Sequence, residues 1–183
     1  MKEVELEIGG QLIDRHYGKW MAVWCELTHS TSKHEQLDML IDADKNGVDD
    51  LEAGPQDRVW IPLQFSFCRN PGLAIPLIAL QYHEVKLNIR FAEVQPATSV
   101  CLYCDYIYLD TDERRRFAQV SHEYLIEQLQ YQTEGSSKSS VKLTLNHPVK
   151  ALYWTNTLAN QLTNQTAKLK LNGHDRFAAQ PRE

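Results

Sequence analysis

Apolar and polar side chains alternate along much of this chain, and a period of two is typical of β-strands with one buried face. The alternation is clearest over residues 4–8 and 85–91, and a third run covers residues 59–67. Pro62 lies in the third run and has no N–H to donate, which predicts a sheet edge or a bulge there. Residues 99–109 are apolar or aromatic on both faces, which predicts a strand covered on both sides. Three shorter strand-like runs follow at residues 141–145, 150–154 and 167–171.

Helical patterns are fewer than strand patterns. Apolar side chains recur every three or four residues over residues 17–27, which predicts a helix with one apolar stripe. A Ser-x-x-Glu capping box that starts at Ser32 predicts a second helix through Ile41. Asp112 is placed to cap a third helix that ends near Val120.

Residues 122–131 fit both periods. A helix that continues from Phe117 would place Tyr124 on its apolar face. A strand would place Leu129 on an apolar face but would have to tolerate Glu127 on the same side. The pattern alone leaves both alternatives open.

Short strands separated by turn-rich loops indicate an all-β chain, an antiparallel sandwich or jelly roll with short helices in its loops. The chain has 183 residues, of which 43% are apolar, enough for one domain or somewhat more. The net charge of -5 argues against a protein that works mainly by neutralising phosphates, so we expect no direct nucleic-acid contact. No apolar run approaches the ~20 residues of a membrane helix, and no apolar leader follows Met1. We therefore expect a soluble chain that is neither exported nor inserted in a membrane.

The residue types that carry catalysis or bind cofactors do not occur in the required spacings. Cys101 and Cys104 form one C-x-x-C pair without a second pair, so we expect small buried side chains rather than a zinc site. No nucleophile elbow and no phosphate-binding loop occurs. No pair of histidines has H-x-H or H-E-x-x-H spacing among His16, His29, His34, His83, His122, His147 and His174. The sequence predicts no catalytic residue and no cofactor, and it nearly excludes a cupin-like metal enzyme.

The acidic stretch of residues 42–52, "DADKNGVDDLE", is the one candidate cation site. Asp42, Asp44 and Asn46 have the spacing of the first three ligands of an EF-hand loop. The bidentate Glu required at position 12 of that loop is replaced by Ala53. We interpret the stretch as a solvated acidic loop, with a metal site at those three residues as the alternative.

Four blocks of the chain resemble the major capsid protein of nucleocytoplasmic large DNA viruses, closest to the algal-virus and iridovirus branch. The blocks occur in the same order as in the family and cover most of the chain: "ELEIGGQLIDRHY" (5–17), "IPLQFSFCRNPGLAIPLIALQYHEVKLNIRF" (61–91), "YIYLDTDERRRFAQVSHEYLIEQLQY" (106–131) and "LNGHDRF" (171–177). The resemblance implies a double jelly roll, three copies of which form a pseudo-hexagonal capsomer of an icosahedral shell.

The same resemblance implies a layout for the chain. Residues 1–110 would form the later part of the first jelly roll, residues 111–120 a linker with a short helix, and residues 121–183 the first strands of the second jelly roll. It favours a strand over Glu123–Tyr131, and it places Arg114–Arg116 where they can pair with acidic groups of a neighbouring sandwich. Members of the family are more than twice this long, so we expect a partial sequence that aggregates or stays partly unfolded when expressed alone.

The leading functional hypothesis is therefore a structural, non-enzymatic virion protein. Its partners would be further copies in a homotrimeric capsomer, neighbouring capsomers and minor capsid proteins, and its location the capsid assembled in the host cell. The alternative is a calcium-dependent carbohydrate-binding β-sandwich that uses the loop at residues 42–52.

Overall fold

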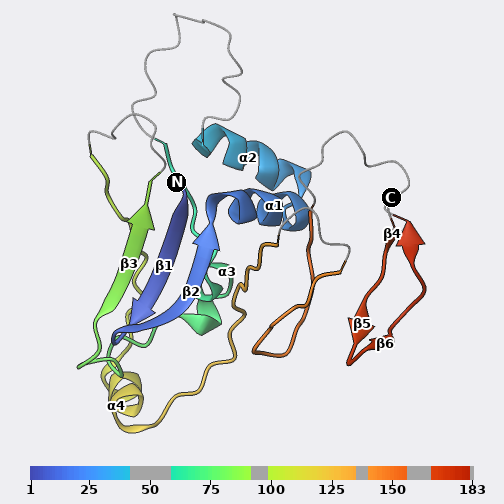
Figure 1. The fold of residues 1–183 in the computed structure, drawn as a ribbon. Coiled ribbons are helices and arrows are strands. Elements are labelled where there is room, and N and C mark those ends of the chain that lie inside the picture. The colour runs from blue at the N-terminus through green and yellow to red at the C-terminus, as the bar shows by residue number, and fades with distance from the viewer. Residues whose placement is uncertain (42–58, 92–98, 135–139, 156–165, 182–183) are drawn as a thin grey trace, which may run out of the picture. The chain divides into compact units, whose positions relative to one another are not determined.

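The structure is a computed structural model, and the chain forms two compact units, residues 1–129 and 130–183 (Figure 1). Each unit is described by itself. The residues that the structure describes are 1–41, 59–91, 99–134, 140–155 and 166–181.

The first unit is built on a three-stranded antiparallel sheet with the order β2-β1-β3. Its strands are β1 (Glu3–Ile8), β2 (Gln11–Tyr17) and β3 (Val85–Arg90). Gly9 and Gly10 join β1 to β2, and both have positive φ, +59° and +82°. Two consecutive positive φ values match the right-handed twist of the flanking strands in a tight hairpin. The alternation predicted for β1 and β3 is confirmed, whereas the sequence pattern did not predict β2.

The core of the first unit lies between this sheet, helix α1 (Gly18–Thr28) and the chain around Phe65. Val4, Leu6, Met21 and Phe65 form its buried cluster. Val4 and Leu6 are two residues apart on β1, so both side chains leave the same face of the central strand. The sheet thus buries one face, as the alternating pattern predicts.

All three predicted helices form. Helix α1 occupies the first position, and α2 (Thr31–Ile41) begins one residue earlier than the predicted cap Ser32. Helix α4 (Thr111–Gln119) ends before Val120, but its N-cap is Asp110 rather than Asp112. The Asp110 carboxylate accepts a hydrogen bond from Glu113 N at 2.9 Å, and Glu113 Oε2 accepts one from Asp110 N. This reciprocal capping box fixes the first turn of α4.

Two predicted strands of the first unit are not formed. Residues 59–65 have no regular structure, and residues 66–69 form the short helix α3. Asn70 then accepts a hydrogen bond from Gly72 N and caps the 3-10 turn η1 (Pro71–Leu73).

The prediction for residues 99–109 is also wrong: no strand forms there, and the run is exposed instead of covered. Tyr108, for example, is 93% exposed. A strand needs a hydrogen-bonded neighbour, and no strand in the described part of the chain pairs with this run.

The second unit contains two small antiparallel pairs. β4 (Thr166–Ala167) pairs with β7 (Gln180–Pro181), and β5 (Lys170–Leu171) pairs with β6 (His174–Asp175). The predicted strand at residues 167–171 is therefore split into two short pieces, and residues 141–145 and 150–154 form none.

In place of a ladder, side chains connect the earlier segments of the second unit. The Gln132 side chain donates to Lys142 O at 2.7 Å and accepts from Thr144 N at 3.1 Å. Every strand pair in the described residues of both units is antiparallel, in agreement with the predicted class.

Candidate functional site

A buried pair of ionisable side chains lies on β2. Asp14 and His16 are two residues apart, so both leave the same face of the strand. His16 Nε2 lies 2.9 Å from Asp14 Oδ2, and the two side chains are only 3% and 4% exposed. The His16 ring also stacks on Phe65 with a centroid distance of 4.7 Å. The pair is therefore part of the core rather than of the surface.

The second oxygen of Asp14 is bound from two further directions. Asp14 Oδ1 accepts hydrogen bonds from Arg15 N at 2.8 Å and from Leu129 N at 3.0 Å. Together with His16 Nε2 these donors surround the carboxylate, which offsets the cost of burying a charge. Nε2 then carries the imidazole proton, and the buried Nδ1 has no hydrogen-bond partner among the described residues.

Arg15 points to the opposite face of β2. Its Nη2 lies 2.6 Å from Glu5 Oε1, directly across the β1–β2 ladder. A side-chain hydrogen bond with Tyr17 raises the pKa of Arg15, and the charge of Glu5 adds to the same shift. The sequence D-R-H-Y thus places a core pair on one face of β2 and a surface ion pair on the other.

The segment that leaves α4, residues 121–129, ends at this buried pair, and we call it the exit segment. His122 Nε2 lies 2.9 Å from Phe117 O, and the two rings stack at 4.7 Å. Near the other end, Gln128 Nε2 donates to Ile13 O, next to the Leu129–Asp14 bond. Between these anchors Glu127 forms an exposed ion pair with Arg69 at 3.4 Å.

The exit segment has neither helical nor strand structure, so the predicted strand over Glu123–Tyr131 is not formed. The helical alternative is not formed either, because α4 ends at Gln119 and Val120 is its C-cap. Side-chain contacts hold the segment in the place where a strand would need a backbone ladder.

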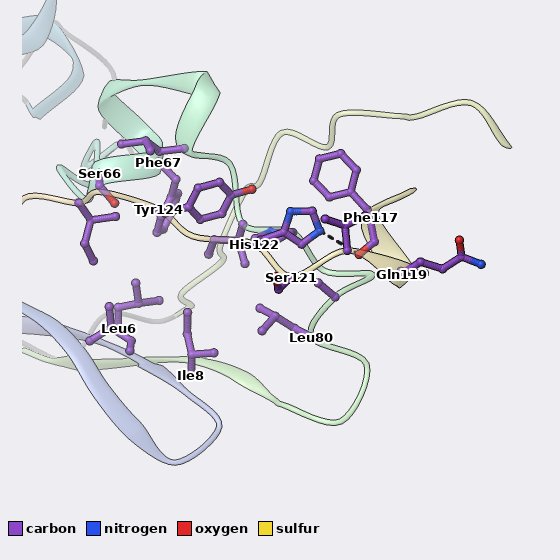
Figure 2. A pocket seen from close by; sticks show the side chains of 18 residues that line it. Leu6, Ile8, Ser66, Phe67, Leu80, Phe117, Gln119, Ser121, His122 and Tyr124 are labelled. Carbon is purple, nitrogen blue, oxygen red and sulfur yellow. Dashed lines mark hydrogen bonds between the residues drawn. The ribbon is translucent and has the colours of Figure 1, made fainter. Parts of the chain in front are cut away.

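The exit segment forms one wall of an apolar pocket of about 560 Å³. Figure 2 shows Leu6 and Ile8 on the strand side of this pocket and Phe67, Tyr124 and His122 on the opposite side. The lining side chains with polar groups are Ser66, Gln119, Ser121, His122 and Tyr124. The volume falls within the range of small-molecule sites, although no set of side chains here has the geometry of a catalytic centre.

Metal binding has little support in the described residues, where no group of three or more His, Cys, Asp or Glu side chains could hold an ion. The predicted alternative at Asp42, Asp44 and Asn46 lies outside the described residues. The described part of the chain also contains no helix with the length and apolarity of a membrane span.

The cysteines differ from expectation. Cys101 and Cys104 are exposed, so the prediction that they are small buried side chains is wrong. Both cysteines lie in the exposed run of residues 99–109, and a run with two apolar faces is buried only when other elements pack on both of its faces. Cys25 is buried, and its Sγ accepts a hydrogen bond from Gln64 Nε2 at 3.8 Å. Burial raises the pKa of the Cys25 thiol.

Sequence reasoning missed the Asp14–His16 pair. Metal-ligand spacings of the histidines do not reveal this pair, whereas the pattern Asp-x-His within a strand aligns both side chains on one face. Within the Arg114–Arg116 cluster, Arg115 pairs with Asp112 at 3.2 Å inside α4. The pairing of the cluster with acidic groups of a neighbouring sandwich stays a prediction.

Comparison with known proteins identifies the family. The family model "Major capsid protein N-terminus" matches residues 1–102, and "Large eukaryotic DNA virus major capsid protein" matches residues 113–166. The chain belongs to the major capsid protein family of large eukaryotic DNA viruses. The resemblance inferred from the four sequence blocks is thereby confirmed.

Individual members of this family are similar along most of the chain. The major capsid protein of Pyramimonas orientalis virus is 50% identical over 193 residues, which cover 97% of this chain and 49% of that protein. The major capsid protein of Paramecium bursaria Chlorella virus 1 is 39% identical over 197 residues, covering 94% of this chain and 44% of that protein. The chain thus spans about half the length of these curated relatives.

A solved structure of the family has a similar fold. A chain of the quasi-atomic model of the PBCV-1 virus capsid superposes with a TM-score of 0.69 at 33% identity. The superposition covers 98% of this chain and 57% of that one. The antiparallel sheets described above are therefore those of a capsid-protein fold.

Proposed function

We propose that this chain is part of a double jelly-roll capsid subunit, three copies of which form a pseudo-hexagonal capsomer of an icosahedral shell. The observation that carries the proposal is the match of residues 1–102 to the N-terminal part of major capsid proteins, together with the TM-score of 0.69 to a virus capsid chain. The function is structural and needs no catalytic residue. The protein would be located in the virion, in the capsid assembled in the host cell.

The proposed layout keeps residues 1–110 in the first jelly roll, residues 111–120 in the linker and residues 121–183 in the first strands of the second. Helix α4 (Thr111–Gln119) supports this layout, since its capping box at Asp110 and its C-cap at Val120 give the proposed linker helix a defined start and end. The first compact unit runs on to Leu129, past the proposed boundary at residue 120, so in this layout residues 121–129 begin the second jelly roll while they pack against the first.

The proposed partners are further copies in the homotrimer, neighbouring capsomers and minor capsid proteins. Assembly by symmetry lets modest contacts between rigid subunits add up over many copies. The net charge of -5 supports contacts with protein rather than with the viral genome.

The test is to express the complete viral reading frame that contains this sequence and to measure its mass by light scattering. We expect a particle of three subunits, with a pseudo-hexagonal outline in negative-stain electron microscopy. A species that stays monomeric at every concentration would contradict the proposal. Antibodies against residues 166–181 should label purified virions, and labelling confined to infected-cell extracts would contradict the proposed location.

A further inference from the structure

We propose that the turn between β5 and β6 is a site of spontaneous deamidation, at which the folded hairpin protects Asn172 and an unfolded chain loses its side-chain amide. The chemistry needs only Asn172, Gly173 and water, so the proposal stands independently of capsomer assembly. It rests on the residues of the turn, on their backbone geometry and on their exposure.

The turn joins two paired strands of the second unit (Figure 1). Leu171 pairs with His174, so Asn172 and Gly173 are the two residues of the loop. Their φ values are +51° and +82°, close to the +59° and +82° of the Gly9–Gly10 turn. Two positive φ values are those of a type I′ turn, for which Asn-Gly is a preferred sequence. Asn172 is the one non-glycine residue with positive φ in the described part of the chain.

An asparagine followed by glycine is open to attack by the next backbone nitrogen. The nitrogen of Gly173 bonds to Asn172 Cγ, the bond from Cγ to the side-chain nitrogen breaks, and ammonia leaves with the proton of the attacking N–H. Water then opens the cyclic imide at either carbonyl and gives Asp or isoaspartate, with no change of oxidation state. Gly173 has no Cβ to shield its nitrogen, and the turn is exposed, with nothing within 4 Å of the place where a Cβ would lie.

The folded turn keeps the reacting atoms apart. The first loop residue of a type I′ turn has a ψ of about +30°, the mirror image of type I. At this ψ the Gly173 nitrogen lies anti to Asn172 Cβ and cannot reach Cγ. Attack therefore requires a rotation of Asn172 ψ that separates Leu171 from His174. Deamidation takes place in the locally open or unfolded chain.

The two products affect the hairpin differently. Asp-Gly also suits a type I′ turn, so the Asp product leaves the hairpin able to close. Isoaspartate routes the backbone through the side-chain carbon and lengthens the loop, so Lys170 and Asp175 no longer meet in register. A chain that stays unfolded for long thus loses the hairpin, whereas a chain that folds promptly keeps it.

The experiment follows deamidation by peptide mapping with mass spectrometry, on the complete viral reading frame that contains this sequence. Folded protein is compared with protein in urea in the same buffer. We expect Asn172 to react at least about tenfold faster in urea, because attack requires the open turn. Asn88 is the internal control, since the β-branched side chain of the following Ile89 crowds the attacking nitrogen.

Asn172→Gly is the matched variant for the consequence. Gly-Gly already forms the corresponding turn of the first hairpin with nearly the same φ values, so the variant keeps the turn and lacks the amide. After long incubation in urea and refolding, the isoaspartate fraction of the wild-type protein should exchange the amides of residues 166–175 at least about tenfold faster than freshly refolded protein. The glycine variant should show no such difference.

Three results would overturn the proposal. The first is an Asn172 that reacts no faster than Asn88 in urea. The second is equal deamidation of Asn172 in the folded protein and in urea. The third is identical exchange over residues 166–175 in the isoaspartate fraction and in freshly refolded protein.

Discussion

The carboxylate of Asp14 accepts a hydrogen bond from the backbone N–H of Leu129 at 3.0 Å, although the two residues are 115 positions apart in the chain. Asp14 lies in the first hairpin, and Leu129 is the last residue of the first compact unit. One buried side chain thus connects the beginning of this unit to its end.

Replacement of Asp14 by Leu should strongly destabilise the first unit. The substitution leaves His16 Nε2 and the Leu129 N–H without their acceptor in a buried site. Loss of one member of such a network costs about 3 kcal/mol. Urea unfolding at low protein concentration measures the change in the free energy of unfolding. Asp112→Leu, on the exposed face of α4, is the control. A loss below about 1 kcal/mol, in the range of ordinary surface substitutions, would contradict this account.

The two glycines of the first hairpin should differ in their response to alanine. Both have positive φ, so either substitution strains the backbone. A Cβ on Gly9 would also lie 2.6 Å from His83 Nδ1, whereas one on Gly10 would meet nothing within 4 Å. We expect Gly10→Ala to lower the free energy of unfolding by about 1 kcal/mol and Gly9→Ala to lower it by more. Equal melting temperatures of the two variants would show that the His83 side chain moves aside freely.

Asp110→Ala should loosen the start of α4. The substitution removes the acceptor of the Glu113 N–H and one half of the capping box, at a cost of about 1 kcal/mol. Amide exchange across residues 111–119 measures the effect. Asp112→Ala is the matched control, since Asp112 lies inside the first turn and does not cap it. We expect the larger effect from Asp110, the observed N-cap, although the sequence pattern favours Asp112.

The cysteines should react with iodoacetamide at different rates. Cys25 is buried and its pKa is raised by burial, so little reactive thiolate is present near neutral pH. Cys101 and Cys104 are exposed and should be alkylated first. Mass spectrometry of the native chain gives the order, and alkylation in urea gives the control in which all sites are accessible. Early modification of Cys25 in the native chain would contradict its burial.

The chain should self-associate through residues 99–109. Leu102, Tyr103, Tyr106, Ile107 and Tyr108 are between 56% and 93% exposed. Contiguous exposed apolar surface of this kind drives association. Sedimentation velocity should show mass that increases with concentration, and Tyr106→Lys with Tyr108→Lys should reduce it. Tyr82→Lys, at an 88% exposed position outside the run, is the control. A monodisperse, cooperatively melting monomer of the wild-type chain would contradict this prediction.

Local patterns predicted elements wherever local forces decide them. The alternation around Val4 and Leu6 predicted β1, because side chains two residues apart must share a face. The apolar stripe containing Met21 predicted α1, and a Ser or Asp near each start predicted α2 and α4 to within two residues. The four family-like blocks led to the family itself, since their order and content are properties of the sequence.

The tertiary structure decided everything that depends on a partner distant in sequence. Residues 99–109 and 123–131 have strand-like composition, but a strand forms only where another strand supplies hydrogen bonds. The same principle explains the buried Asp14–His16 pair: its alignment on one face follows from the sequence, whereas its burial required Phe65 and Leu129 from elsewhere in the chain. The sequence by itself determined the family and the local elements, because those depend on near neighbours. Only the tertiary structure determined which polar groups are buried and what satisfies them, because those contacts join residues far apart in the chain.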